Sequence, residues 1–102
     1  MANGTLAAFE PTGTVTLAAG TTSASIALAG GGDTVVVTNT SAALAFVRFD
    51  AGTGGVATPS DMPVLPGARV ILGVNSLIVY AAATLVGGSG NILFTRGRGA
   101  FV

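Results

Sequence analysis

The side chains best suited to acid–base chemistry in this sequence are four carboxylates, Glu10, Asp33, Asp50 and Asp61. The chain has no histidine or lysine, so a general acid and its base would both have to come from this set. Each carboxylate stands in a short stretch containing glycine, proline or serine, where aspartate commonly caps a turn by bonding to nearby backbone. We therefore predict turn-capping carboxylates and no enzyme. A glycosidase with two acidic groups flanking the scissile bond is the enzymatic alternative.

The sequence also offers few ligands for a metal or a cofactor. Without cysteine or histidine, the usual zinc, haem and iron–sulfur sites cannot be built. Asp33, Asp50 and Asp61 could supply oxygen ligands to calcium, but their spacing matches no calcium-binding loop. The glycine-rich stretch at residues 87–91 lacks the lysine of a phosphate-binding loop and precedes a predicted strand. We expect no metal, no cofactor and no small-molecule substrate.

Two arginines near the C-terminus, Arg96 and Arg98, alternate with glycines. The net charge of the chain is zero, and two arginines neutralise too few phosphates for stable nucleic-acid binding. We predict instead that they pair with carboxylates or carbonyls of a neighbouring protein, with a solvated tail as the alternative. Two phenylalanines near the chain ends and one loop aspartate complete the candidates for partner contact, which are Phe9, Asp61, Arg96, Arg98 and Phe101.

Charge is scarce throughout the 102 residues: only 8% are charged, against about 25% in an average soluble domain. Half of the chain is apolar, which argues against intrinsic disorder. Residues 1–13 contain neither a basic residue nor an apolar run, so we expect no signal peptide. The most apolar window, residues 70–86, is interrupted by Asn75 and Ser76, which favours two strands joined by a turn over a membrane helix. We expect no membrane association.

The elements that must position these side chains are predicted to be strands. Short β-branched or alternating runs are separated by glycine, proline, asparagine and aspartate. The predicted strands cover residues 14–18, 23–29, 34–39, 44–50, 68–74, 77–83 and 91–96. This spacing predicts an all-β, single-domain antiparallel β-sandwich or jelly roll of about 7–8 short strands. The sandwich would span residues 14–96, between an N-terminal arm at 1–13 and a C-terminal arm at 97–102.

Side-chain alternation predicts which faces of these strands are buried. Ala24, Ile26 and Leu28 share one face of their strand, and serines and an alanine share the other. The valine run at 35–37 indicates burial on both faces, and Phe46 and Phe49 must point to opposite sides. Residues 51–66 are rich in glycine, threonine and proline and are predicted to form a long loop. Loops of this length are usually functional or involved in assembly.

Four motifs between residues 34 and 99 occur in the order found in small structural proteins of tailed bacteriophages. They are an asparagine-containing strand end, an F-V-R-F strand, a D-x-P-x-x-P-G turn and a terminal T-R-G segment, at residues 35–39, 46–49, 61–67 and 95–97. The sequence resembles this family over most of its length, with Arg98 at a position where an acidic residue is expected. The resemblance implies a β-sandwich virion component, such as a capsid decoration or cement protein, and commonly a trimer.

The scarcity of charge favours assembly as well, because weakly charged β edges and surfaces tend to be covered by neighbours. We therefore expect a decoration protein on the capsid surface of the virion, made in the host cytoplasm, that binds the major capsid protein and copies of itself. The alternative is a tail, spike or fibre-associated module that contacts the host surface through the loop at 51–66.

Overall fold

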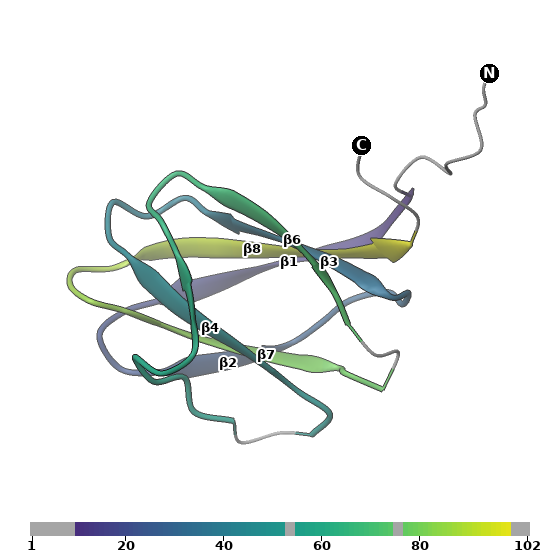
Figure 1. Ribbon diagram of the computed structural model, residues 1–102, viewed down its shortest axis with the longest axis horizontal. Coiled ribbons are helices and arrows are strands. Elements are labelled where there is room, and N and C mark those ends of the chain that lie inside the picture. Colours follow the sequence, from purple (N-terminus) through teal and green to yellow (C-terminus); the bar gives the residue numbers. More distant parts are fainter. Residues whose placement is uncertain (1–9, 53–54, 75–76, 99–102) are drawn as a thin grey trace.

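The computed structural model describes residues 10–52, 55–74 and 77–98, and these form eight strands with no helix among them (Figure 1). The strands in chain order are β1 (Glu10–Ala19), β2 (Ala24–Ala27), β3 (Thr34–Asn39), β4 (Ala45–Asp50), β5 (Met62–Val64), β6 (Arg69–Gly73), β7 (Tyr80–Leu85) and β8 (Gly90–Arg98). The all-β prediction is confirmed. In the described part of the chain no helix is long and apolar enough to cross a membrane.

The strands form two four-stranded antiparallel sheets, in the orders β1-β8-β3-β6 and β2-β7-β4-β5 (Figure 1). The first half of the chain pairs with the second half in reverse order: β1 with β8, β2 with β7, β3 with β6 and β4 with β5. This long hairpin rolls up when β8 also pairs with β3, and β7 with β4. The result is the eight-stranded jelly-roll form of the β-sandwich.

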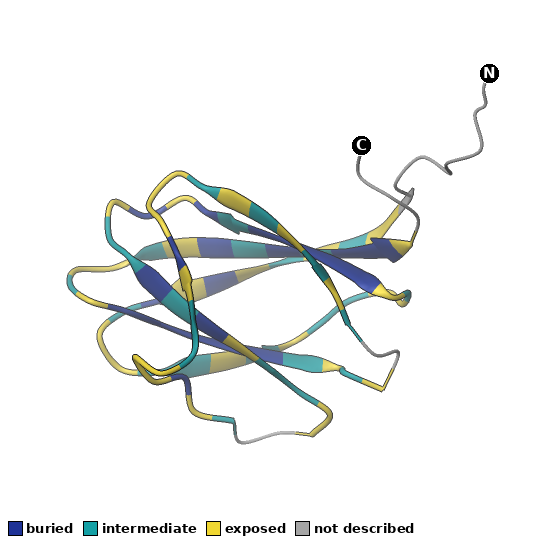
Figure 2. Ribbon diagram, in the orientation of Figure 1, coloured by how far each residue is buried: buried dark blue, intermediate teal, exposed yellow. Residues whose placement is uncertain are grey.

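The core lies between the two sheets, where alternate residues of each strand point inward (Figure 2). Phe94 is fully buried and meets Phe49 edge-to-face, with ring centroids 5.9 Å apart. Val35, Val36 and Val37 are all buried, as the valine run predicts. The prediction for β2 is also confirmed, since Ala24 and Ile26 pack against the core while Ser25 and Ala27 are exposed.

The strand bounds differ from the predicted ones in three instructive places. β5 lies within the region that was expected to be a loop. The sequence does not predict this strand, because it has only three residues and one of them is a proline. The strand–turn–strand expected at residues 70–86 does contain β6 and β7, but they belong to different sheets and so form no hairpin. β1 and β8 extend to Glu10 and Arg98, which pair with each other, so the sandwich reaches into both predicted arms.

A buried asparagine joins the end of β3 to the loops around it. The Asn39 amide nitrogen donates to the carbonyls of Ala43 (2.9 Å) and Val64 (3.0 Å). Its amide oxygen accepts from both the backbone N–H and the hydroxyl of Ser41. The turn predicted at residues 39–41 is thus formed around a buried side chain that hydrogen-bonds to the backbone groups near it.

Candidate functional site

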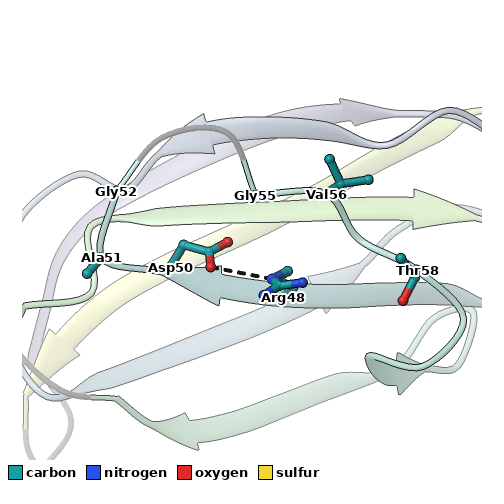
Figure 3. Close-up of a pocket in the computed structure, with 7 residues that line it drawn as sticks. All are labelled: Arg48, Asp50, Ala51, Gly52, Gly55, Val56 and Thr58. Atoms are coloured by element: carbon teal, nitrogen blue, oxygen red, sulfur yellow. Dashed lines mark hydrogen bonds and ion pairs between the residues drawn. The ribbon is translucent and has the colours of Figure 1, made fainter.

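Three charged side chains, Arg48, Asp50 and Asp61, lie on or beside the outer face of the sheet β2-β7-β4-β5. Val47 and Phe49 of β4 face the core, so the alternate residues Arg48 and Asp50 point outward. The Arg48 Nε atom lies 3.4 Å from Asp50 Oδ1, and the two side chains are 43% and 25% exposed (Figure 3). An exposed pair of this kind contributes about 0–1 kcal/mol to stability. Its importance here is that it places charged groups on this face of the sheet.

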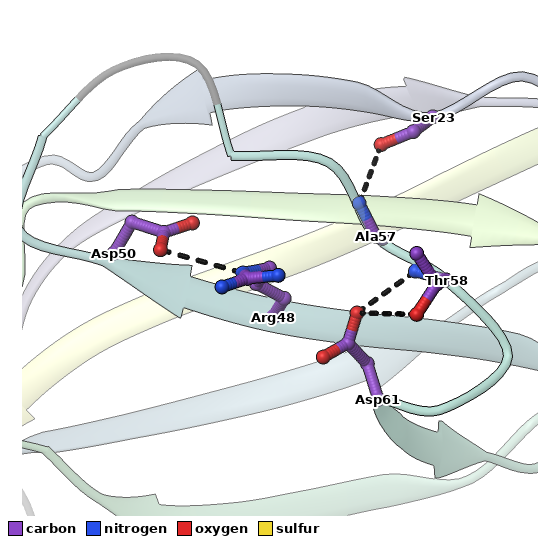
Figure 4. Close-up of polar contacts among 6 residues, drawn as sticks. All are labelled: Ser23, Arg48, Asp50, Ala57, Thr58 and Asp61. Atoms are coloured by element: carbon purple, nitrogen blue, oxygen red, sulfur yellow. Dashed lines mark hydrogen bonds and ion pairs between the residues drawn. The ribbon is translucent and has the colours of Figure 1, made fainter.

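The segment that follows β4 turns back over this face of the sheet. The Ala57 N–H donates to the hydroxyl of Ser23, just before β2, over 2.8 Å, and Ala57 itself is buried (Figure 4). Ala82 of β7 pairs with Arg48 and so shares its outward face, yet it is only 1% exposed. The predicted long loop therefore covers part of the sheet, between its edge strand β2 and β4.

Asp61 closes a turn at the end of this segment. Its carboxylate oxygen Oδ2 accepts a hydrogen bond from the Thr58 N–H at 2.8 Å, and its own N–H donates to the Thr58 carbonyl at 2.9 Å (Figure 4). Pro59 occupies the second position of the turn, where its fixed φ is favourable. The structure thus gives Asp61 the turn-capping role predicted for the aspartates.

An open cavity of about 590 Å³ lies between the sheet and the covering segment (Figure 3). Its described lining consists of Arg48, Asp50, Ala51, Gly52, Gly55, Val56 and Thr58. The Asp50 carboxylate packs against the Gly55 backbone so closely that an added Cβ would lie 1.8 Å from Oδ2. The cavity presents guanidinium donors, carboxylate acceptors and a threonine hydroxyl, a set that can bind a polar group by hydrogen bonds.

The other aspartate considered as a calcium ligand lies elsewhere in the fold. Asp33 precedes β3, where its carboxylate accepts from the Thr34 hydroxyl at 3.2 Å and its carbonyl accepts from the Val74 N–H. Within residues 10–52, 55–74 and 77–98 no three acidic, histidine or cysteine side chains are grouped so that they could hold a metal ion.

The structure corrects the prediction that Arg96 contacts a partner. Arg96 is only 2% exposed, and its guanidinium donates to carbonyls of the same chain. Nε and one terminal nitrogen donate to the Gly32 carbonyl at 3.1 and 2.8 Å, and the other terminal nitrogen donates to the Ile78 carbonyl. The carbonyl partners predicted for this arginine therefore lie within the molecule, in the β2–β3 and β6–β7 connections.

A sequence signal for this burial was present. In β8 the alternate residues Ile92, Phe94 and Arg96 share one face of the strand, and the first two are large and apolar. Arg98 is exposed at the end of β8, and its contact with a partner stays a prediction. Phe9 and Phe101 lie outside the described residues.

Large apolar side chains on the surface are a second feature of the described chain. Six of them are between 42% and 71% exposed: Val56, Leu65, Ile71, Leu77, Val79 and Val86. Leu65 and Val86 directly follow Val64 and Leu85, which both pair with Ala45, so these two lie at the same end of their sheet.

Comparison of the chain with protein-family models, with curated proteins and with solved structures finds no match in any of the three. The fold and the surfaces described above are therefore the structural basis for the proposals that follow.

Proposed function

We propose that this protein is a virion structural component, a capsid decoration protein that binds the assembled major capsid protein shell and stabilises it. The observation that carries the proposal is the group of six exposed large aliphatic side chains on a chain that is only 8% charged. A net charge of zero and exposed apolar side chains leave little electrostatic repulsion to oppose association with other proteins. The bacteriophage-like motifs at residues 35–39, 46–49, 61–67 and 95–97 support the virion assignment.

The jelly-roll topology is consistent with this role, since viral capsid domains often have it. The fold also occurs in lectins and in enzymes, so it supports the proposal without deciding it. Association with further copies of the chain belongs to the same proposal, and the trimeric state comes from the resemblance alone.

One end of the sandwich is the proposed capsid-binding end. Glu10 and Arg98 pair with each other, so the described chain begins and ends at neighbouring positions in the sheet. Of the candidate contact residues, Phe9 precedes Glu10 by one position in the sequence, and Phe101 follows Arg98 by three. The exposed Arg98 at this end of the sheet is the described residue of the proposed capsid contact.

Binding to the assembled shell but not to free capsid subunits would stabilise the shell by mass action. Each bound copy adds a contribution that depends on its concentration relative to its dissociation constant, about 2.7 kcal/mol at a hundredfold excess. Decoration should therefore delay disassembly most when the sites are saturated.

The test uses purified shells that lack this protein, to which the full chain is added at increasing concentration. Sedimentation measures binding, and intact particles are counted after heating or guanidinium treatment. We expect binding that saturates and increased particle survival. Arg98→Glu should weaken binding, whereas Arg48→Glu, on the outer face of β4, should not. Equal survival with and without saturating protein would refute the stabilising role.

A tail, spike or fibre-associated module is the second candidate. It is favoured by one observation, the open polar cavity that Arg48 and Asp50 form with the segment after β4. In that case Arg48→Glu, and not Arg98→Glu, should reduce attachment to host cells. Immunogold labelling of complete particles distinguishes the candidates, because it places the protein on the head or on the tail.

A further inference from the structure

Strand β5 covers only half of the edge of β4. On one side of β4, β7 pairs with all six residues from Ala45 to Asp50. On the other side, β5 has three residues and pairs only with the first three of them. The chain before β5 turns away at Asp61, whose N–H donates to the Thr58 carbonyl. Among the described residues, therefore, no strand pairs with this edge of β4 beyond Val47.

The backbone N–H and C=O groups of Phe49 point toward this open edge. The Val86 N–H donates to the Leu44 carbonyl, so Leu44 and every second residue after it bond to β7. Pro63 has no N–H and faces Phe46, which agrees with this alternation. The residues between them bond to β5, and Phe49 continues that series after β5 has ended.

A groove of about 530 Å³ lies beside this edge, and its apolar lining consists of Phe49, Met62, Leu72, Val74 and Ile78 with neighbouring residues. These side chains come from β4 and β5 in one sheet, from β6 in the other and from the connection after β6. Phe49, Leu72 and Val74 pack against the core but are only partly buried. The core is therefore incompletely covered here, by a groove within the range of about 300–1,000 Å³ that is usual for ligand pockets.

The rim of the groove carries charged side chains. Arg48 and Asp61 belong to the lining, and Asp50 stands beside them at the end of β4 (Figure 4). Arg48 is already paired with Asp50. One positive and two negative groups give this rim a net negative charge, so a basic group is its electrostatic complement.

We propose that the groove binds an extended segment of another polypeptide, with apolar and basic residues in alternation, as an added strand that continues β5 along β4. In this antiparallel arrangement one residue of the segment faces Phe49 and exchanges two hydrogen bonds with it. The side chain of that residue points into the groove, toward Leu72 and Val74, because facing residues of neighbouring strands share one side of the sheet. The residues next to it point outward, where a lysine or arginine lies beside Asp50 and Asp61.

The sequence of this chain indicates that the partner is a different polypeptide. Its only basic side chains are four arginines, and all of them lie within β4, β6 and β8: Arg48, Arg69, Arg96 and Arg98. Residues 1–9 and 99–102, outside the strands, contain no arginine or lysine. A second copy of the chain therefore offers no segment of the required chemistry that is not already part of a sheet.

The first test measures the binding of three synthetic peptides to the purified full chain by titration calorimetry. Each peptide is about seven residues long, which is a common strand length, and has blocked ends. The first alternates valine with lysine, the second alternates valine with glutamate, and the third is the lysine peptide with a methyl group on the backbone nitrogen of its central valine. We expect the lysine peptide to bind with a Kd below about 1 mM. The glutamate peptide should bind more weakly because it brings like charges to the rim, and the methylated peptide because it cannot donate to the Phe49 carbonyl. No binding of the lysine peptide, or equal binding of either control peptide, overturns the proposal.

The second test places the lysine peptide on the protein. Asp61→Asn removes one rim charge but keeps an acceptor for the Thr58 N–H, and it should raise the Kd about two- to fivefold. Glu10→Gln removes the same charge from β1, at the opposite edge of its sheet from β6, and should leave the Kd unchanged. With saturating peptide the Phe49 amide should exchange with solvent about tenfold more slowly, whereas the Phe46 amide, which is bonded to β7, should keep its rate. Equal effects of the two substitutions, or an unchanged rate at Phe49, overturn the proposal. These measurements use the isolated chain, so their outcome is independent of the proposed role in the virion.

Discussion

Replacing Arg96 by methionine tests the most heavily buried charge in the described chain. Methionine replaces the aliphatic part of the arginine side chain, so the main loss is the guanidinium with its hydrogen bonds to the carbonyls of Gly32 and Ile78. Each buried acceptor left without a partner costs about 1–3 kcal/mol. Removing the arginine also removes the cost of burying its charge, which offsets part of this loss. We expect the free energy of unfolding to fall by about 2–4 kcal/mol.

Urea denaturation measures this change, followed by circular dichroism. With a slope of about 1–3 kcal/mol per molar urea, the midpoint should fall by roughly 1–3 M at unchanged slope. Arg48→Met is the matched control, because Arg48 is 43% exposed and its ion pair with Asp50 should contribute less than about 1 kcal/mol. Equal midpoints for the two variants would show that the Arg96 hydrogen bonds do not hold the loops, and the reasoning would be wrong.

Three further substitutions test local features of the fold. Asn39→Ala should lower the free energy of unfolding by about 2–4 kcal/mol in the same urea assay, because several buried backbone groups lose their partners. Gly32→Ala should lower the midpoint of thermal unfolding measured by circular dichroism, because Gly32 has a φ of +127° and an added Cβ would lie 2.1 Å from the Gly97 oxygen. Asp61→Ala should cost about 1 kcal/mol and speed amide exchange at Thr58, whereas Asp61→Asn, which keeps an acceptor, should do so less; equal exchange in all three proteins would contradict the turn-capping role.

Strand β3 shows what local pattern can predict. Its bounds, Thr34–Asn39, were expected from the sequence, because a β-branched run between a glycine-rich turn and an asparagine turn favours a strand whatever its neighbours are. β5 shows where local pattern fails. Three residues with a central proline have no strand signal of their own, and Met62–Val64 is a strand because it pairs with β4.

The candidate contact residues divide in the same way. Asp61 caps a turn through neighbours within three residues, so its role could be predicted from local sequence. The acceptors of Arg96 lie 64 and 18 residues away, and only the folded chain brings them to the guanidinium. The segment after β4 likewise covers the sheet because Ala57 meets Ser23, a contact over 34 residues.

Local sequence patterns are enough to predict an all-β sandwich with little charge, because alternation and turn residues act over a few neighbouring positions. The pairing of β1 with β8 and the burial of Arg96 could be learned from the tertiary structure alone. These features depend on how the two halves of the chain pair in reverse order and roll up. The free energy of that arrangement comes from contacts between residues far apart in sequence, which local patterns do not encode.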